Sequence, residues 1–316
     1  MTPKVSILIP VYNRNRYIEE CIQSALDQTF KEFEIVIVDN ASDDGTWEIC
    51  QQFAAKDSRV RIYRNEENIG PVRNWKRCAE EAKGEFSKIL FSDDTLEPEC
   101  LAVMVPKLEN PDVSLVFCAA RIGKSKEEST LAYSHKAIDR LSSREFLNLI
   151  IDGKAPVSPG ATLIRTKDLL NNLHFDFPTT TPRPFDKHGA GPDVMLMLLT
   201  AESYSSVASI ATPLVYFRAH DGSFSVENSS MQIFDGYASA LCYYLSLKYK
   251  YSLYIKYTAK MWLKRMRSVQ SFINPADFIA AHNGEYNFLS IIMLFSYSII
   301  FIVNRLFEMP WKILRN

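Results

Sequence analysis

The sequence predicts an α/β fold in which a mostly parallel sheet carries helices on both faces, followed by a helical C-terminal region. Short runs of apolar and β-branched residues, typical of buried strands, alternate along the first third of the chain with segments of helical periodicity. Several of these runs end at proline or at acidic residues. Such alternation favours right-handed crossovers between parallel strands.

The individual elements follow from local patterns. Strands are expected at residues 5–10, 33–38, 59–64, 87–91, 115–120, 161–164 and 206–217. Helices are expected at residues 17–28, 47–55, 75–82, 96–101, 144–151 and 193–202. In the first of these helices the apolar side chains fall on one face, as a helix packed on a sheet requires. Gly84 is expected to end the third helix.

Composition narrows the class of protein. Apolar residues make up 47% and charged residues 23% of the chain, which is the balance of an ordinary globular protein. The formal net charge of −1 gives no overall field for nucleic acid, so we expect no nucleic-acid partner. The six cysteines lack metal-ligand spacing and are expected to be reduced. The N-terminal apolar run is too short for a secretory signal, which favours a cytoplasmic location.

Polar side chains follow three of the expected strands. Tyr12, Asp39 and Asp93 each stand at or just beyond a strand end. Ligands of parallel α/β sheets bind beyond the carboxyl ends of the strands. The sequence therefore predicts one crevice that these three residues share.

Two adjacent carboxylates, Asp93 and Asp94, indicate a metal site. They would repel each other unless they are solvated or bridged by a cation. Hard oxygen ligands suit Mg²⁺ or Mn²⁺, which usually take one or two carboxylates plus substrate phosphates. The alternative is a polar turn in which Asp94 caps a helix at residues 96–101.

Five motifs occur in a fixed order. They are VSILIPVYN at residues 5–13, IVIVDNASDDGT at 35–46, NIG at 68–70, AKGEF at 82–86 and SDD at 92–94. Taken together they resemble the family-2 glycosyltransferases of GT-A fold, specifically over residues 4–105 and traceably to residue 226. The resemblance implies a Rossmann-like domain and an inverting enzyme that moves sugar from a nucleotide-sugar to an acceptor hydroxyl.

The resemblance also implies how the nucleotide is held. Pro10, Val11 and Tyr12 would form one wall of the base pocket, with the Tyr12 ring as a stacking face. Asp39 would accept a hydrogen bond from a base ring N–H, which favours a UDP- or dTDP-sugar. The family usually shows Asp-Asp-Gly-Ser where residues 39–42 read DNAS, but the aspartate is kept. The alternative for Asp39 is a helix or Asx-turn cap.

The remaining ligand contacts come from two further segments. By the resemblance, Asn68, Arg73 and Asn74 would reach the ribose or the phosphates, although Arg73 is alternatively a solvated surface charge. In the segment that begins at Ser92, Asp93 would contact the ribose and Asp94 would be the main protein ligand of the metal ion.

Downstream, the resemblance points to a base and a histidine. Asp193 would be the catalytic base, or simply the N-cap of its helix, and Asp186 is the alternative base. His220 would approach the metal or the diphosphate, and Arg218 would help to neutralise phosphate; the alternative for His220 is a structural role. Residues 160–162, which read GAT, are expected to face the sugar of the nucleotide-sugar, where the small side chains would leave room.

The C-terminal region differs from the rest. Residues 241–270 contain no acidic side chain but include Lys256, Lys260 and Lys264 at helical spacing. This pattern favours an anionic membrane surface, or else a solvated helical cap. Residues 286–304 carry no charge and would span a membrane, lie in its interface or pack in a core. We expect three parts: 1–112 for the nucleotide-sugar, 113–226 for the acceptor, and a membrane-associated region at 227–316.

Two other functions remain to be weighed. A sugar-nucleotide-binding module without activity would not need the retained acidic residues. A nucleotidyltransferase would carry a glycine-rich basic loop after its first strand, where residues 10–13 read PVYN. The sequence therefore favours a glycosyltransferase at the inner face of the plasma membrane, acting on a glycan or lipid-linked acceptor.

Overall fold

The computed structural model describes residues 2–135, 138–176, 185, 189–223, 230–248, 257–259 and 262–263. The chain forms two compact units, Met1–Phe175 with Pro184–Ser230, and Asp176–Arg183 with Met231–Asn316. All candidate site residues that the structure describes belong to the first unit. The expected division after residue 112 falls inside this unit and stays a prediction, as does the boundary after residue 226.

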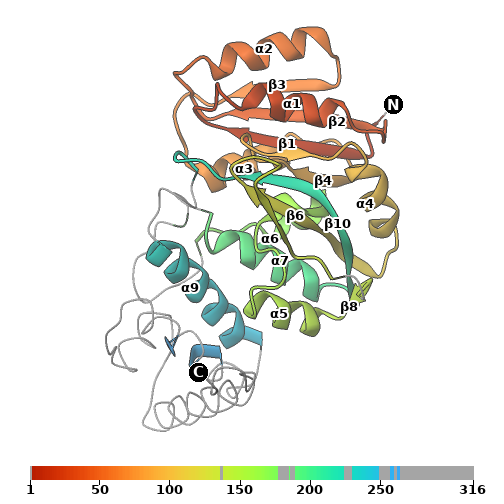
Figure 1. The fold of residues 1–316 in the computed structure, drawn as a ribbon, viewed down its shortest axis with the longest axis vertical. Coiled ribbons are helices and arrows are strands. Elements are labelled where there is room, and N and C mark those ends of the chain that lie inside the picture. The colour runs from red at the N-terminus through yellow and green to blue at the C-terminus, as the bar shows by residue number, and fades with distance from the viewer. Residues whose placement is uncertain are drawn as a thin grey trace, which may run out of the picture. The chain divides into compact units, whose positions relative to one another are not determined.

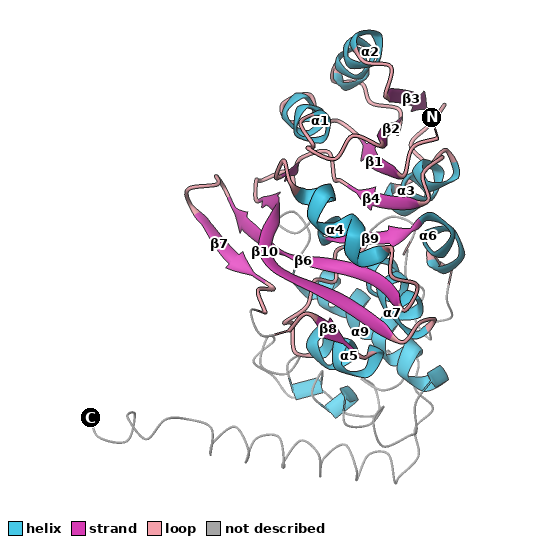
Figure 2. Cartoon of the chain, turned by 90° about the vertical axis from the view of Figure 1, so that its right-hand side faces the viewer, coloured by secondary structure: helices cyan, strands magenta, loops and turns pink. Residues whose placement is uncertain are grey.

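The N-terminal half of the first unit has the predicted alternation. Its strands are β1 (Val5–Val11), β2 (Phe33–Asp39), β3 (Val60–Arg64) and β4 (Phe86–Ile89), paired in parallel in the order β3-β2-β1-β4. The helices between them are α1 (Ile18–Leu26), α2 (Thr46–Lys56) and α3 (Pro71–Glu80). Helices α1 and α3 lie on opposite sides of β1, so the sheet is covered on both faces (Figure 2).

The rest of the first unit extends the sheet. Its strands are β5 (Thr95–Leu96), β6 (Val113–Gly123), β7 (Ser129–Ala132), β8 (Arg140–Leu141), β9 (Thr162–Arg165) and β10 (Ser206–Arg218). Its helices are α4 (Cys100–Leu108), α5 (Ser143–Ile151), the 3₁₀ turn η1 (Pro159–Ala161), α6 (Thr166–Asn172) and α7 (Pro192–Glu202) (Figure 1). In the second unit the structure describes α9 (Ser230–Lys248).

Strand direction brings distant segments to one edge of the sheet. β9 is antiparallel to both of its neighbours, β4 and β6, so β6 runs in the same direction as β4. β10 is parallel to β6. The carboxyl ends of β1, β2, β4 and β10 therefore share one edge of the ten-stranded sheet.

Two local predictions are wrong. The helix expected at residues 96–101 begins only at Cys100, because Leu96 pairs with β10 in β5. Gly84 does not cap α3, which ends at Glu80. A Cβ at Gly84 would lie 2.5 Å from the backbone nitrogen of Ser6, so glycine is required there for a close backbone approach to β1.

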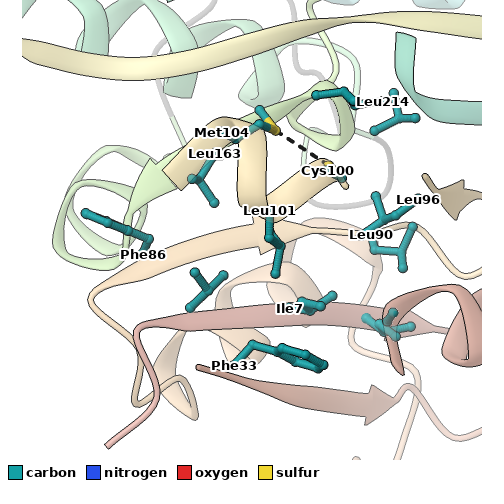
Figure 3. Packing of buried hydrophobic residues seen from close by; sticks show 14 of the residues in the cluster. Ile7, Phe33, Phe86, Leu90, Leu96, Cys100, Leu101, Met104, Leu163 and Leu214 are labelled. Atoms are coloured by element: carbon teal, nitrogen blue, oxygen red, sulfur yellow. Dashed lines mark hydrogen bonds between the residues drawn. The ribbon is translucent and has the colours of Figure 1, made fainter. Parts of the chain in front are cut away.

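The core sits on both faces of β1. Ile7 and Ile9 belong to a cluster that includes Leu101 and Met104 of α4, part of which is drawn in Figure 3. Leu8, pointing the other way, belongs to a second cluster. Burial of each such side chain is worth about 1.5–3 kcal/mol, which fixes the strand from which the site residues project. All six cysteines are buried free thiols.

Candidate active site

The predicted convergence at the sheet edge involves four strand ends. Tyr12 follows β1, Asp39 ends β2, Asp93 follows β4, and Arg218 ends β10. The first three were expected from the sequence to share a crevice. Arg218 arrives from more than a hundred residues further along because β10 has the same direction as β1.

Asp94 is fixed by the backbone of β10. Its peptide N–H closes a turn onto the carbonyl of Phe91, and its side chain is only 7% exposed. Thr95 pairs with Tyr216, so Asp94 lies beside the end of β10 and its Oδ1 accepts the Arg218 peptide N–H at 2.9 Å. The alternative in which Asp94 caps the next helix is therefore wrong, since the N-cap of α4 is Glu99.

Asp93 is contacted by a histidine and two arginines. Its Oδ2 lies 2.9 Å from Nε2 of His220 and 3.5 Å from Nε of Arg14. The side chain of Arg218 donates to the main-chain carbonyl of Asp93 at 3.0 Å. The structure thus brings His220 to the acidic pair, in contact with Asp93.

The loop that carries His220 is held by α1 and the residue before it. The Tyr17 ring lies 4.6 Å from the His220 ring and 5.3 Å from the Arg218 guanidinium. Glu20 accepts a hydrogen bond from Arg218 at 2.5 Å. Tyr17 and Glu20 were expected only as part of an amphipathic helix. Their contacts with Arg218 and His220 were not predicted, because no local pattern indicates a partner two hundred residues away.

Burial sets the electrostatics of the acidic pair. Burial, and then the neighbouring charge of Asp93, raises the pKa of Asp94 well above its usual range, against the opposing charges of Arg218 and Lys88. Lys88 is fully buried on β4 and donates to the carbonyls of Gly160 and Ile89. Burial lowers the pKa of this lysine. Lys88 was not predicted to belong to the site, although a lysine in an otherwise apolar strand is itself a signal.

The oxygen atoms of the acidic pair fit a hard cation. Among the described residues, no three or more His, Cys, Asp or Glu side chains group as a complete metal cage. Two adjacent carboxylates match the usual Mg²⁺ site, in which substrate phosphates and water supply the other ligands. Burial is the main cause of the raised pKa of Asp94 and the charge of Asp93 adds to it, so a cation at this position would stabilise the ionised pair.

Among the described residues, the two carboxylate oxygens of Asp39 differ in their hydrogen bonding. Its Oδ2 accepts the Ser42 peptide N–H at 3.1 Å and lies 3.1 Å from Nε of Arg64. The bond from Ser42 is the loop cap foreseen as the alternative role. Its Oδ1 is buried and, within the described part of the chain, has no hydrogen-bond partner. Nearby, Tyr12 is 43% exposed beyond the buried residues Pro10 and Val11.

The two asparagines predicted to reach the ribose or phosphates, Asn68 and Asn74, belong to a hydrogen-bonded network with Asn40 and Asn65. The amide of Asn40 donates to Asn68, and Asn65 donates to both Asn40 and Asn74. Asn74 also donates to the carbonyl of Val38 in β2. These bonds shape the end of β2, and a direct contact of Asn68 or Asn74 with nucleotide stays a prediction.

The other predicted ligand contacts are placed as follows. The guanidinium of Arg73 lies 4.5 Å from the centre of the Phe175 ring. Ser92 is buried beside Asp93. Their contacts with nucleotide stay predictions.

Asp193 lies in the first turn of α7. Its Oδ1 accepts the peptide N–H groups of Gly191 and Val194 at 2.9 and 2.7 Å. The N-cap is Gly191, so the expected capping role is wrong in position although the carboxylate does satisfy backbone groups at the helix start. Asp186 lies outside the described residues.

Gly160 does not face open space. A Cβ there would lie 2.9 Å from Cε1 of Phe217 and 3.2 Å from Cδ2 of Phe91. The expectation that Gly160 leaves room for a sugar is therefore corrected: aromatic rings from the two segments that carry Asp93 and Arg218 fill that space.

The membrane prediction concerns residues that largely lie outside the described part of the chain. Lys256, Lys260, Lys264 and residues 286–304 are all outside it. Of the helices that are described, none is long and apolar enough to cross a bilayer.

The comparisons with known proteins agree with this geometry. The model of the family "Glycosyl transferase family 2" matches residues 6–179. A relative from Campylobacter jejuni, "GalNAc(5)-diNAcBac-PP-undecaprenol beta-1,3-glucosyltransferase", is 30% identical over 178 residues, which cover 55% of this chain and 55% of the relative. Matches to the first three curated relatives span 33% to 60% of those proteins.

Two solved structures have a similar fold. Residues 1–349 of Staphylococcus aureus TarS in complex with UDP give a TM-score of 0.59 at 18% identity, covering 95% of this chain and 92% of that one. The mannosyltransferase PcManGT from Pyrobaculum calidifontis, in complex with GDP-Man and Mn²⁺, gives 0.55 at 18% identity, covering 98% and 89%. At these identities the likeness extends to the fold alone.

Proposed function

The chain belongs to glycosyl transferase family 2, and on that premise we propose that it is an inverting enzyme that moves a sugar from a UDP- or dTDP-sugar to an acceptor hydroxyl. The observation that carries the proposal is the shared edge. It places the Asp93–Asp94 pair, with its arginine and histidine partners, on the same edge as Asp39. A nucleotide that spans this edge has a base pocket at one end and a diphosphate site at the other.

The base would bind between Tyr12 and Asp39. The exposed Tyr12 ring offers a stacking face, and Oδ1 of Asp39, which no described residue bonds, requires a hydrogen-bond donor. Uracil and thymine supply one from their ring N–H. Asn68, Arg73, Asn74, Ser92 and Asp93 would complete the ribose and phosphate contacts, with Pro10 and Val11 behind the base.

The diphosphate would bind at the acidic pair. Asp94 would hold Mg²⁺ or Mn²⁺, with His220 beside the metal or the diphosphate. Such an ion neutralises the charge that builds on the diphosphate as the sugar leaves. The protein's own contribution comes from hydrogen-bond donors: the cations Arg14 and Arg218, together with His220, already contact the acidic pair and would orient phosphate oxygens.

Asp193 would remove the proton from the acceptor hydroxyl. Its Oδ1 is anchored by two backbone N–H groups, so the carboxylate is held in one orientation at the start of α7. A positioned base acting during one displacement opposite the diphosphate inverts configuration and needs no enzyme nucleophile.

For the acceptor we propose a glycan or a lipid-linked sugar at the inner face of the plasma membrane, in bacterial cell-surface glycan synthesis. The name of the C. jejuni relative specifies an undecaprenol-linked acceptor. The basic stretch within residues 241–270 supports attachment to an anionic leaflet, at about 1 kcal/mol for each basic residue near the surface. This attraction weakens with salt, so the uncharged apolar stretch at residues 286–304 should keep full-length protein sedimenting with membranes in high salt. Protein that stays in the supernatant without detergent would contradict the attachment.

A panel of sugar nucleotides tests the function itself. Purified protein with Mn²⁺ and an acceptor extract should release nucleoside diphosphate from a UDP- or dTDP-sugar, and NMR of the product should show an inverted anomeric centre. The alternative, an inactive sugar-nucleotide-binding module, predicts nucleotide binding without turnover on any member of the panel.

A further inference from the structure

We propose that Arg64 is a positioning residue that fixes the orientation of the Asp39 carboxylate, and thereby selects nucleotides whose base presents a ring N–H. The inference rests on the proposed function, because it concerns the base pocket of the same site. It assigns the choice of base to a pair of residues instead of to Asp39 alone.

The pair is built into the sheet. Arg64 is the last residue of β3 and is the register partner of Asp39, the last residue of β2. Its Nε lies 3.1 Å from Oδ2 of Asp39. Because both residues end paired strands, their backbone positions are fixed by the same parallel ladder.

The guanidinium is also held from its other sides. Its Nη2 donates to the carbonyl of Ser42 at 2.6 Å, and its centre lies 5.5 Å from that of the Trp47 ring. These contacts place Arg64 before any nucleotide binds. The cation therefore arrives preorganised and loses little side-chain freedom in holding Asp39.

As a consequence, the two carboxylate oxygens of Asp39 have different roles. Oδ2 accepts from Arg64 and from the Ser42 peptide N–H, while Oδ1 is buried with no partner in the described part of the chain. A buried carboxylate needs a nearby cation, and Arg64 supplies it. With Oδ2 held by these two donors, Oδ1 is the oxygen left to accept a hydrogen bond from a ligand.

This arrangement discriminates between bases. N3 of uracil or thymine and N1 of guanine carry a hydrogen, whereas N3 of cytosine and N1 of adenine carry a lone pair. A lone pair opposite Oδ1 would leave two buried acceptors facing each other, and sites built to hydrogen-bond one group reject the analogue that lacks it.

Calorimetric titration with UDP and with CDP tests the proposal on the full-length protein. Wild type should bind UDP at least about tenfold more tightly than CDP, as expected for one good base contact. Arg64→Met keeps an unbranched chain but removes the charge and the Nε donor, and should reduce the preference to within about threefold. The matched control is Arg77→Met, since Arg77 is 42% exposed against 41% for Arg64 and pairs with Glu81; it should keep the wild-type preference.

A second variant tests whether Asp39 itself contacts the base. Asp39→Asn offers an amide N–H₂ to the base and should favour CDP over UDP. A wild-type preference for UDP in Arg64→Met would overturn this inference alone, and a wild-type preference in Asp39→Asn would show that Asp39 does not contact the base. Wild-type protein that binds neither nucleotide would overturn the proposed function as well.

Discussion

Replacing Gly160 with alanine should disturb the two segments that carry the acidic pair and Arg218. The new Cβ would lie 2.9 Å from Cε1 of Phe217 and 3.2 Å from Cδ2 of Phe91, both closer than ordinary carbon contacts. Phe91 precedes Asp93 by two residues and Phe217 immediately precedes Arg218. Overpacking of this kind costs about 1–3 kcal/mol of unfolding free energy.

The change should cost more in turnover than in stability. Both rings would have to shift by a few tenths of an ångström or more, and misplacement of about 1 Å at a reacting centre costs about a hundredfold in rate. We therefore expect a turnover loss of about tenfold or more in Gly160→Ala, together with weaker metal binding. Denaturant unfolding and nucleoside diphosphate release measure the two effects.

A compensating variant separates steric from general effects. Phe217→Leu removes the ring atoms that the new methyl group would meet, so the double variant should recover part of the lost stability and rate. Wild-type stability and turnover in Gly160→Ala alone would refute the reasoning, because the two rings would then not transmit the added volume.

Three further predictions concern the acidic pair and the base. Asp94→Ala should abolish transfer, and EDTA should silence the wild-type enzyme until Mn²⁺ or Mg²⁺ is restored; full turnover in EDTA would contradict the metal assignment. Asp193→Asn should leave UDP affinity nearly unchanged while removing most of the turnover, and a wild-type rate would move the base to Asp186 or another group. Because the pKa of folded Asp94 is raised, the folded protein binds this proton more tightly than the unfolded chain, and metal-free stability falls as pH rises from the usual aspartate range through the raised value. A metal must displace that proton, so the increase in unfolding temperature caused by Mn²⁺ with UDP should grow with pH in wild type but not in Asp94→Asn.

The local part of the fold was predictable because it depends on local patterns. Apolar β-branched runs and helical periodicity located β1, β2, β3 and the helices between them to within a few residues. The short strand β5 was not predictable, since two residues acquire strand geometry only by pairing with β10. That tertiary pairing overrode the helical pattern at Leu96.

The site was predictable at the strand ends and less so between them. Asp39, Asp93 and Asp94 follow buried strands, so their shared edge follows from parallel topology. Lys88, Arg64 and Glu20 owe their positions to contacts across the sheet or along β10, which no local spacing encodes.

Ala41 departs from the family pattern and has a strained backbone conformation. Where the family usually has glycine, this chain has Ala41, and Ala41 adopts a φ of +64°. A left-handed conformation costs a residue with a Cβ roughly 1–2 kcal/mol. The Ser42 and Arg64 contacts around Asp39 hold this loop in place despite that cost.

The central claim is that one nucleotide-sugar spans the edge from Asp39 to Asp94. A crystal structure of the protein with UDP and Mn²⁺ tests it most directly. We expect the uracil ring to stack on Tyr12 and to donate its ring N–H to Oδ1 of Asp39. The diphosphate and the metal ion should lie at Asp94. Nucleotide bound elsewhere, or a uracil edge turned away from Asp39, would contradict it.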